Sequence, residues 1–124
     1  MVNDQNQQEI YYQNAVSLVG EDDVVQSYVY MAGSTDMGDV SQIMPAYTHT
    51  QAAQSASAMD DFLINDFELA IIVPAKVLAM TVIDLLADDA AKAKEIKAKC
   101  KPILTKEEYI LTMDSLLTEE EYFQ

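Results

Sequence analysis

The sequence has few of the residues on which many kinds of binding site depend. Its 124 residues include three glycines, one cysteine and one histidine. The cysteine, Cys100, excludes an internal disulfide, and it lies in a lysine-rich stretch without a second thiol or a histidine nearby. So few glycines, and the lack of a G-x-x-x-x-G-K-S/T motif, argue against a backbone loop that cradles phosphate. The composition therefore points away from disulfide-rich and phosphate-binding proteins.

Basic residues are also scarce. There are seven of them against 21 acidic residues, and the formal net charge is −14. Because phosphate backbones and anionic lipids repel such a chain, we expect no nucleic-acid partner and no membrane partner. Residues 1–8 lack the basic start and the apolar core of a signal peptide, so the cytoplasm is the expected compartment.

One apolar run is long, from Leu69 to Ala87, but it contains Pro74, Lys76 and Asp84. A membrane-spanning helix needs about 20 nearly uncharged residues. The run therefore predicts a buried helix rather than a membrane span. Half of all residues are apolar and 23% are charged, which is typical of a globular protein, and no repeat or linker divides the chain. We expect one domain.

The first half of the chain predicts a helix and then two strands. Residues 5–18 mix apolar and polar side chains, and Gly20 follows where a helix cap is expected. Residues 24–31 are rich in β-branched and aromatic side chains, which favour a strand. Residues 40–47 predict a shorter strand, whose proline suits a sheet edge or the end of a strand. A strand, a loop and a strand are thus expected over residues 24–49.

The second half predicts helices, after a loop of small and polar residues at 48–61. Asp66 is positioned to cap a helix whose apolar surface, over residues 67–87, is too wide to be a single stripe. Such a helix is packed on more than one side. Pro74 kinks it unless the helix begins there. Residues 88–99 begin with acids and end with lysines, as the helix dipole favours.

A last helix is expected after Thr105, which forms a capping-box pattern with Glu108. Helices are thus predicted over residues 66–116, followed by an acidic tail at residues 117–124. The order of elements predicts an α/β fold, with short strands early and packed helices late.

The loop after the first predicted strand carries the best candidate site. Ser34, Thr35 and Asp36 offer two hydroxyls, a carboxylate and backbone N–H groups to a ligand. The same residues also suit an ordinary turn in which a side chain hydrogen-bonds the nearby backbone. The adjacent acids, such as Asp60 with Asp61, solvate a surface or begin a helix and do not indicate a catalytic pair.

Several short segments follow one another along the chain. They are Asn14-Ala15, Gly20-Glu21-Asp22, Gly33-Ser34-Thr35-Asp36-Met37-Gly38-Asp39-Val40-Ser41, Met44-Pro45, Pro74-Ala75-Lys76, Ala79-Met80-Thr81, Asp84-Leu85-Leu86 and Thr105-Lys106-Glu107-Glu108-Tyr109. Taken in this order, they resemble the C-terminal part of the zinc-dependent amidohydrolases and metallopeptidases that include aminobenzoyl-glutamate hydrolases, aminoacylases and carboxypeptidases. The resemblance covers residues 9–116.

The resemblance implies a fragment of a catalytic domain that hydrolyses an amide bond of a small acyl or aminoacyl substrate. Ser34, Thr35 and Asp36 match the loop beside the substrate pocket in that family. The general-base glutamate and most metal ligands belong to the N-terminal half, to which this chain has no counterpart. We therefore nominate no catalytic residue and expect no activity from the chain alone. The expected partner is that N-terminal half, or a second copy.

The zinc of the full-length family is not expected to bind this chain by itself. The family's histidine ligand before the Pro-Ala-Lys segment falls here on Gln54 or Ala58, neither of which is a usual zinc ligand. His49 lies a few residues upstream and is the one candidate metal ligand; the other interpretation is a loop histidine without a metal. A catalytic zinc takes about three protein ligands, so the others must come from elsewhere.

A second hypothesis belongs to another class. The chain is then a small, acidic, noncatalytic helical module that binds a protein through the apolar surface of residues 67–87.

Overall fold

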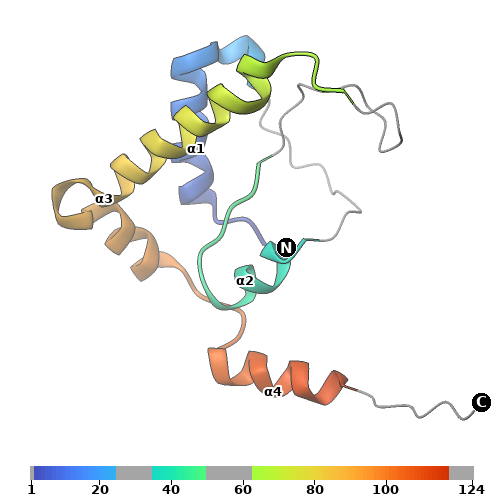
Figure 1. The fold of residues 1–124 in the computed structure, drawn as a ribbon. Helices are drawn as coiled ribbons and strands as arrows, with labels where there is room; N and C mark the ends of the chain where they lie inside the picture. Colours follow the sequence, from blue (N-terminus) through green and yellow to red (C-terminus); the bar gives the residue numbers. More distant parts are fainter. Residues whose placement is uncertain (1, 25–34, 50–62, 118–124) are drawn as a thin grey trace, which may run out of the picture.

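The computed structural model describes residues 2–24, 35–49 and 63–117, and within these ranges the protein is helical, without strands (Figure 1). Four α-helices follow one another along the chain. They are α1 (Gln5–Val19), α2 (Met37–Ile43), α3 (Val73–Lys99) and α4 (Lys106–Leu116). A 3₁₀ turn (Glu21–Asp23) follows α1, and a π-helical turn (Glu68–Ile72) leads into α3.

The expected α/β fold is therefore wrong for the part of the chain that the structure describes. The predicted strand at 40–47 begins as the last turn of α2, Met44 at the end of that helix is extended, and residues 45–47 belong to no strand. Contacts with a distant segment hold the helix there, since the Leu104 N–H bonds the Gln42 carbonyl at 3.1 Å and α4 packs against α2, and β propensity yields to such context. The strand predicted at 24–31 lies outside the described residues, except for Val24.

The first helix is present where the sequence predicts it. The Asp4 carboxylate accepts a hydrogen bond from the Gln7 N–H at 2.9 Å and caps the first turn of α1. At the other end, Gly20 donates its N–H to the Val16 carbonyl at 2.9 Å and adopts φ 93° and ψ 159°. Only glycine adopts this backbone conformation without strain.

We expect Gly20→Ala to lower the free energy of unfolding by about 1 kcal/mol, because a Cβ is strained at this positive φ. Gly38 is the matched control, since it lies inside α2 at a backbone without positive φ and with open space where an added Cβ would lie. Gly38→Ala is expected to be neutral or stabilising. Urea denaturation of both variants measures the difference, and equal losses would contradict the role of Gly20.

Pro74 shapes the start of α3. The Asp66 carboxylate accepts the Leu69 N–H at 2.8 Å, as expected of a cap. Proline has no N–H for the carbonyl four residues back, and its ring crowds that carbonyl. The helix widens just before it, and the Val73 N–H bonds the Glu68 carbonyl five residues back. Pro74 thus lies in the first turn of α3, where its missing N–H costs least, and a π-helical turn precedes it.

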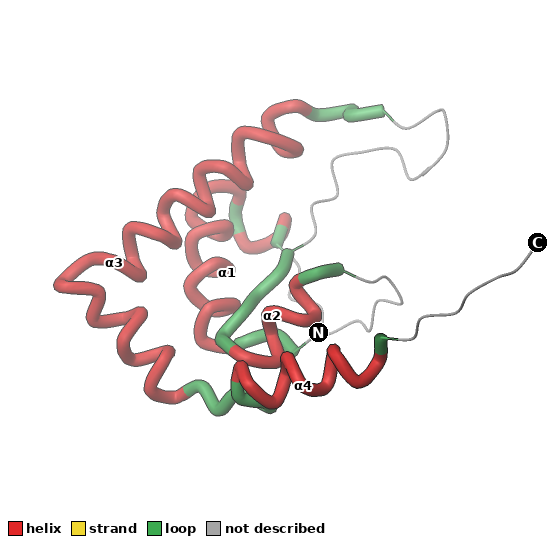
Figure 2. Tube along the Cα trace, turned by 60° about the horizontal axis from the view of Figure 1, so that its bottom comes forward, coloured by secondary structure: helices red, strands yellow, loops and turns green. Residues whose placement is uncertain are grey.

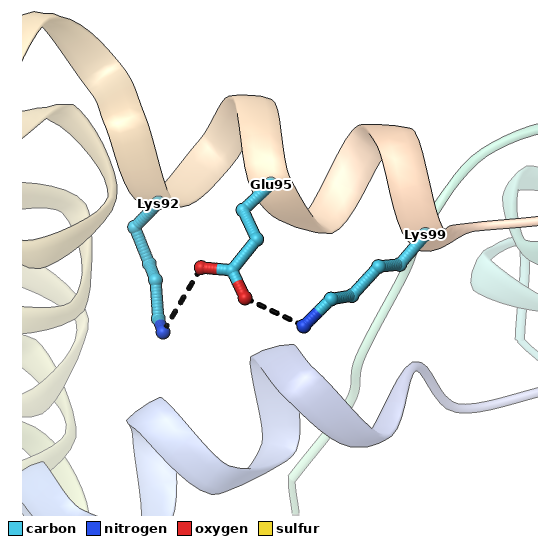
Figure 3. Close-up of polar contacts among 3 residues, drawn as sticks. All are labelled: Lys92, Glu95 and Lys99. Atoms are coloured by element: carbon cyan, nitrogen blue, oxygen red, sulfur yellow. Dashed lines mark hydrogen bonds and ion pairs between the residues drawn. The ribbon is translucent and has the colours of Figure 1, made fainter.

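The helix α3 is bent into two arms at residues 87–90. Asp88, Asp89 and Ala90 have positive φ, between 50° and 57°, so the helical path breaks where the sequence predicts one helix to follow another. In the second arm, Glu95 accepts hydrogen bonds from Lys92 at 3.4 Å and Lys99 at 2.6 Å (Figure 3). Both lysines hold the pKa of this exposed carboxyl below its usual value.

The last helix confirms the capping box. The Thr105 hydroxyl accepts the Glu108 N–H at 3.2 Å, and the Glu108 carboxylate accepts the Thr105 N–H at 2.8 Å. The helix α4 lies beside α2, away from α1. The acidic tail predicted after it lies, from residue 118 on, outside the described residues.

The core is small and forms between α1 and the first arm of α3. Figure 2 shows α1 in the angle between the two arms of α3, and in Figure 1 the first arm crosses in front of α1. Tyr11 and Ala15 of α1 are 8% exposed and pack with Val77 of α3, which is 1% exposed. Partly buried residues surround them, namely Val24, Tyr47 and Val73.

Candidate functional site

The predicted binding loop ends in the first turn of α2. Ser34 lies outside the described residues. Thr35 and Asp36 are exposed, and the Thr35 carbonyl accepts the Gly38 N–H at 2.8 Å. The Thr35 hydroxyl also accepts the Met37 N–H at 3.4 Å, which is the geometry of an ordinary turn. The Asp36 carboxylate makes no cap hydrogen bond to α2, and the residue is open to solvent.

His49 lies against α1. Its ring stacks on the Tyr11 ring with centroids 4.4 Å apart, and the Tyr47 ring lies 5.4 Å from the same Tyr11 ring. The preceding segment is tied to the start of α1, because the Asp4 N–H bonds the Ala46 carbonyl at 2.8 Å. Burial lowers the pKa of His49, which favours the neutral imidazole.

A neutral imidazole is the form that binds zinc, but the described residues do not gather around His49 the ligands that a catalytic zinc needs. No group of three or more histidine, cysteine, aspartate or glutamate residues is placed to hold a metal there. Gln54 and Ala58 lie outside the described residues. The described donor set therefore does not fit a catalytic zinc, which takes about three protein ligands.

The structure contains a polar contact between α1 and α3 that the sequence did not predict. The Asn14 amide, 9% exposed, donates to the Asp84 carboxylate at 2.8 Å and to the Thr81 hydroxyl at 3.3 Å. The Thr81 hydroxyl in turn donates to the Val77 carbonyl at 2.8 Å. The sequence holds one indication that Asn14 faces the core, because Tyr11, Asn14 and Ala15 have the spacing of one helix face. All three are buried against α3.

A hollow of about 550 Å³ lies between the end of α1 and the start of α3. Leu18 and Val73 are among its apolar walls, and Asp66, Glu68 and Lys76 are among its charged ones. Two of these carboxylates already have partners. Glu68 pairs with Lys76 at 3.1 Å, and Asp66 caps the following helix. The hollow is large enough for a small molecule, but these charged groups are engaged with one another or with the backbone.

On the side away from α1, α3 and the π-helical turn before it expose large apolar side chains that no other described residue covers. We call this surface the outer face and define it by Phe67, Ile71, Leu78, Val82, Ile83 and Leu86, which are 49–66% exposed. By length and composition, the helix Glu68–Lys99 is also a candidate membrane span among the described residues. The sequence predicts that the helix over residues 67–87 is packed on more than one side. Among the described residues, α1 covers only the side that carries Val77.

Of the charges that interrupt the apolar run, Asp84 binds Asn14 on the side of α1. Lys76 is exposed and lies about two helical turns before Ile83, where it pairs with Glu68 at the edge of the outer face. No family model, no characterised protein and no solved structure matches the chain.

Proposed function

We propose that this chain is a noncatalytic portion of a metal-dependent amidohydrolase. It presents the loop that ends at Asp36 to a small acyl or aminoacyl substrate. The metal ligands and the general base come from another polypeptide segment. The proposal rests on the resemblance of the sequence segments, and the architecture of the described part is helical instead of the α/β arrangement that the sequence predicts.

The observation that supports the proposal most is the contact between Asn14 and Asp84. Both residues belong to segments that carry the resemblance, yet they are 70 positions apart in the sequence. Thr81, from a third such segment, joins the same contact. Segments that matter together in one enzyme family are expected to pack together, and here they form the interface of α1 and α3.

The chain is expected to bind no zinc tightly by itself, because the described part offers no set of three ligands. Isothermal titration of the purified chain with zinc, with His49→Ala as the matched variant, measures this. Tight binding of one zinc ion that His49→Ala abolishes would contradict the proposed division of ligands.

The positive test is the DNA upstream of the Met1 codon. An open reading frame that encodes histidine, aspartate and glutamate ligands is expected. Co-expression of its product with this chain should then give zinc-dependent hydrolysis of an N-acetylated amino acid, and Asp36→Asn should reduce that rate. Absence of such a frame, or hydrolysis by the upstream product without this chain, would overturn the proposal.

The outer face favours a second candidate, a noncatalytic protein-interaction module. Stable monomers rarely expose a continuous apolar surface of this kind. This candidate predicts a cooperative melt for the purified chain. A fragment of an enzyme is instead expected to bind hydrophobic dyes and to aggregate, so the two candidates differ in solution behaviour.

A further inference from the structure

The side chains that define the outer face are all apolar, and the exposed pair of Lys76 with Glu68 borders them. Leu78, Val82 and Leu86 recur every four residues, and Ile83 widens the row on one side. From Phe67 to Leu86 the surface is roughly 30 Å long, at about 1.5 Å per residue. A stripe of this length and width is typical of a helix that packs on a protein core.

Carboxylates stand at both ends of this face. Asp66 precedes it, Glu68 follows its first residue, and Asp88 and Asp89 come after its last. Lys76 pairs with Glu68 at 3.1 Å, and Lys94 pairs with Asp89 at 2.7 Å. In the part of the chain that the structure describes, Asp66 and Asp88 have no lysine partner. Each end therefore keeps a net negative charge.

These end charges disfavour a second copy of the chain as the occupant. In a parallel pairing Asp66 would face Asp66, and in an antiparallel pairing it would face Asp88. Like charges in contact are unfavourable, and each copy also carries a net charge of −14. The same charge repels an anionic lipid surface.

We propose that the outer face docks a polypeptide segment that is apolar along its length and carries lysine or arginine at both ends, roughly 30 Å apart. Burial of the apolar side chains supplies most of the affinity, and the charges at the two ends select the partner. This inference deepens the interaction candidate above and rests on it. It does not require the amidohydrolase assignment.

The test uses a fluorescent helical peptide of about 20 residues, built of leucine and alanine with two lysines at each end, and a matched peptide with glutamates in their place. Fluorescence anisotropy with the whole chain measures binding. The lysine-ended peptide is expected to bind at least about tenfold more tightly at low salt, and the preference should shrink as salt screens the charges. Asp66→Asn with Asp88→Asn should remove the preference while leaving affinity for both peptides.

The double variant Leu78→Ser and Ile83→Ser should abolish binding of either peptide. Both residues are exposed, so the fold should persist, which circular dichroism checks. Leu111→Ser on α4, 68% exposed, is the matched control and should bind as the parent does. Equal affinity for the two peptides would overturn the proposal. So would tighter binding to phosphatidylcholine vesicles, or a dimer in sedimentation that the double variant dissociates. The zinc and reading-frame experiments are independent of all these outcomes.

Discussion

Replacement of Val77 with aspartate is expected to abolish the cooperative thermal unfolding of the chain. Val77 is 1% exposed and joins α3 to Tyr11 and Ala15 of α1. A carboxylate there would be buried among apolar groups without a partner. Such a burial costs at least about 3 kcal/mol. Since small domains have marginal stability and this core is small, the variant should lose its fold.

Val82→Asp is the matched control for this experiment. It makes the same chemical change further along α3, on the outer face, where Val82 is 51% exposed. Its carboxylate remains in water, so the melting transition monitored by circular dichroism should shift little. A cooperative melt in Val77→Asp, or equal losses in the two variants, would show that α1 and α3 do not pack as described.

Replacement of Tyr11 with alanine is expected to lower the free energy of unfolding by about 3 kcal/mol, the usual cost of removing a buried aromatic ring. Tyr11 is 8% exposed and contacts both Tyr47 and His49 through its ring. Tyr11→Phe keeps the ring and is expected to cost less than about 1 kcal/mol. Urea denaturation at neutral pH compares the two. A similar loss in both would place the contribution in the hydroxyl instead of the ring.

The same pair of variants predicts a pH dependence. Burial, together with the neighbouring Tyr47, raises the pKa of Tyr11 from 10 to about 12. The folded chain therefore holds this proton where the unfolded chain has lost it, so the stability that the proton contributes is complete below pH 10 and falls between pH 10 and about 12. Tyr11→Phe should fall less over this range. Burial also raises the pKa of Tyr47, so some decline should remain.

The helix ends could be predicted from the sequence because their signals are local. Gly20 ends α1, Asp66 caps the approach to α3, and Thr105 with Glu108 begins α4. Each cap depends on a backbone group within a few residues of the side chain. The break after Ala87 is also indicated, since the sequence predicts a new helix from Asp88.

The candidate site was less predictable. The sequence groups His49 with the metal chemistry of the resemblance, whereas the structure stacks its ring on Tyr11. It presents Asp84 as one charge that interrupts an apolar run, whereas that carboxylate binds Asn14. Residue type indicates the chemistry of which each group is capable, but the partner of each group lies far away in the chain.

The sequence by itself determined the net charge, the lack of disulfide and phosphate-loop chemistry, the helix caps and the apolar character of residues 67–87. Only the tertiary structure decided that residues 40–43 are helical, that Val77 lies inside while Val82 lies outside, and that Asn14 meets Thr81 and Asp84. The physical reason is the distance along the chain over which each interaction acts. Capping and composition act over a few residues, whereas burial depends on which distant helix covers which face, and a helix that is apolar nearly all round leaves that choice to packing.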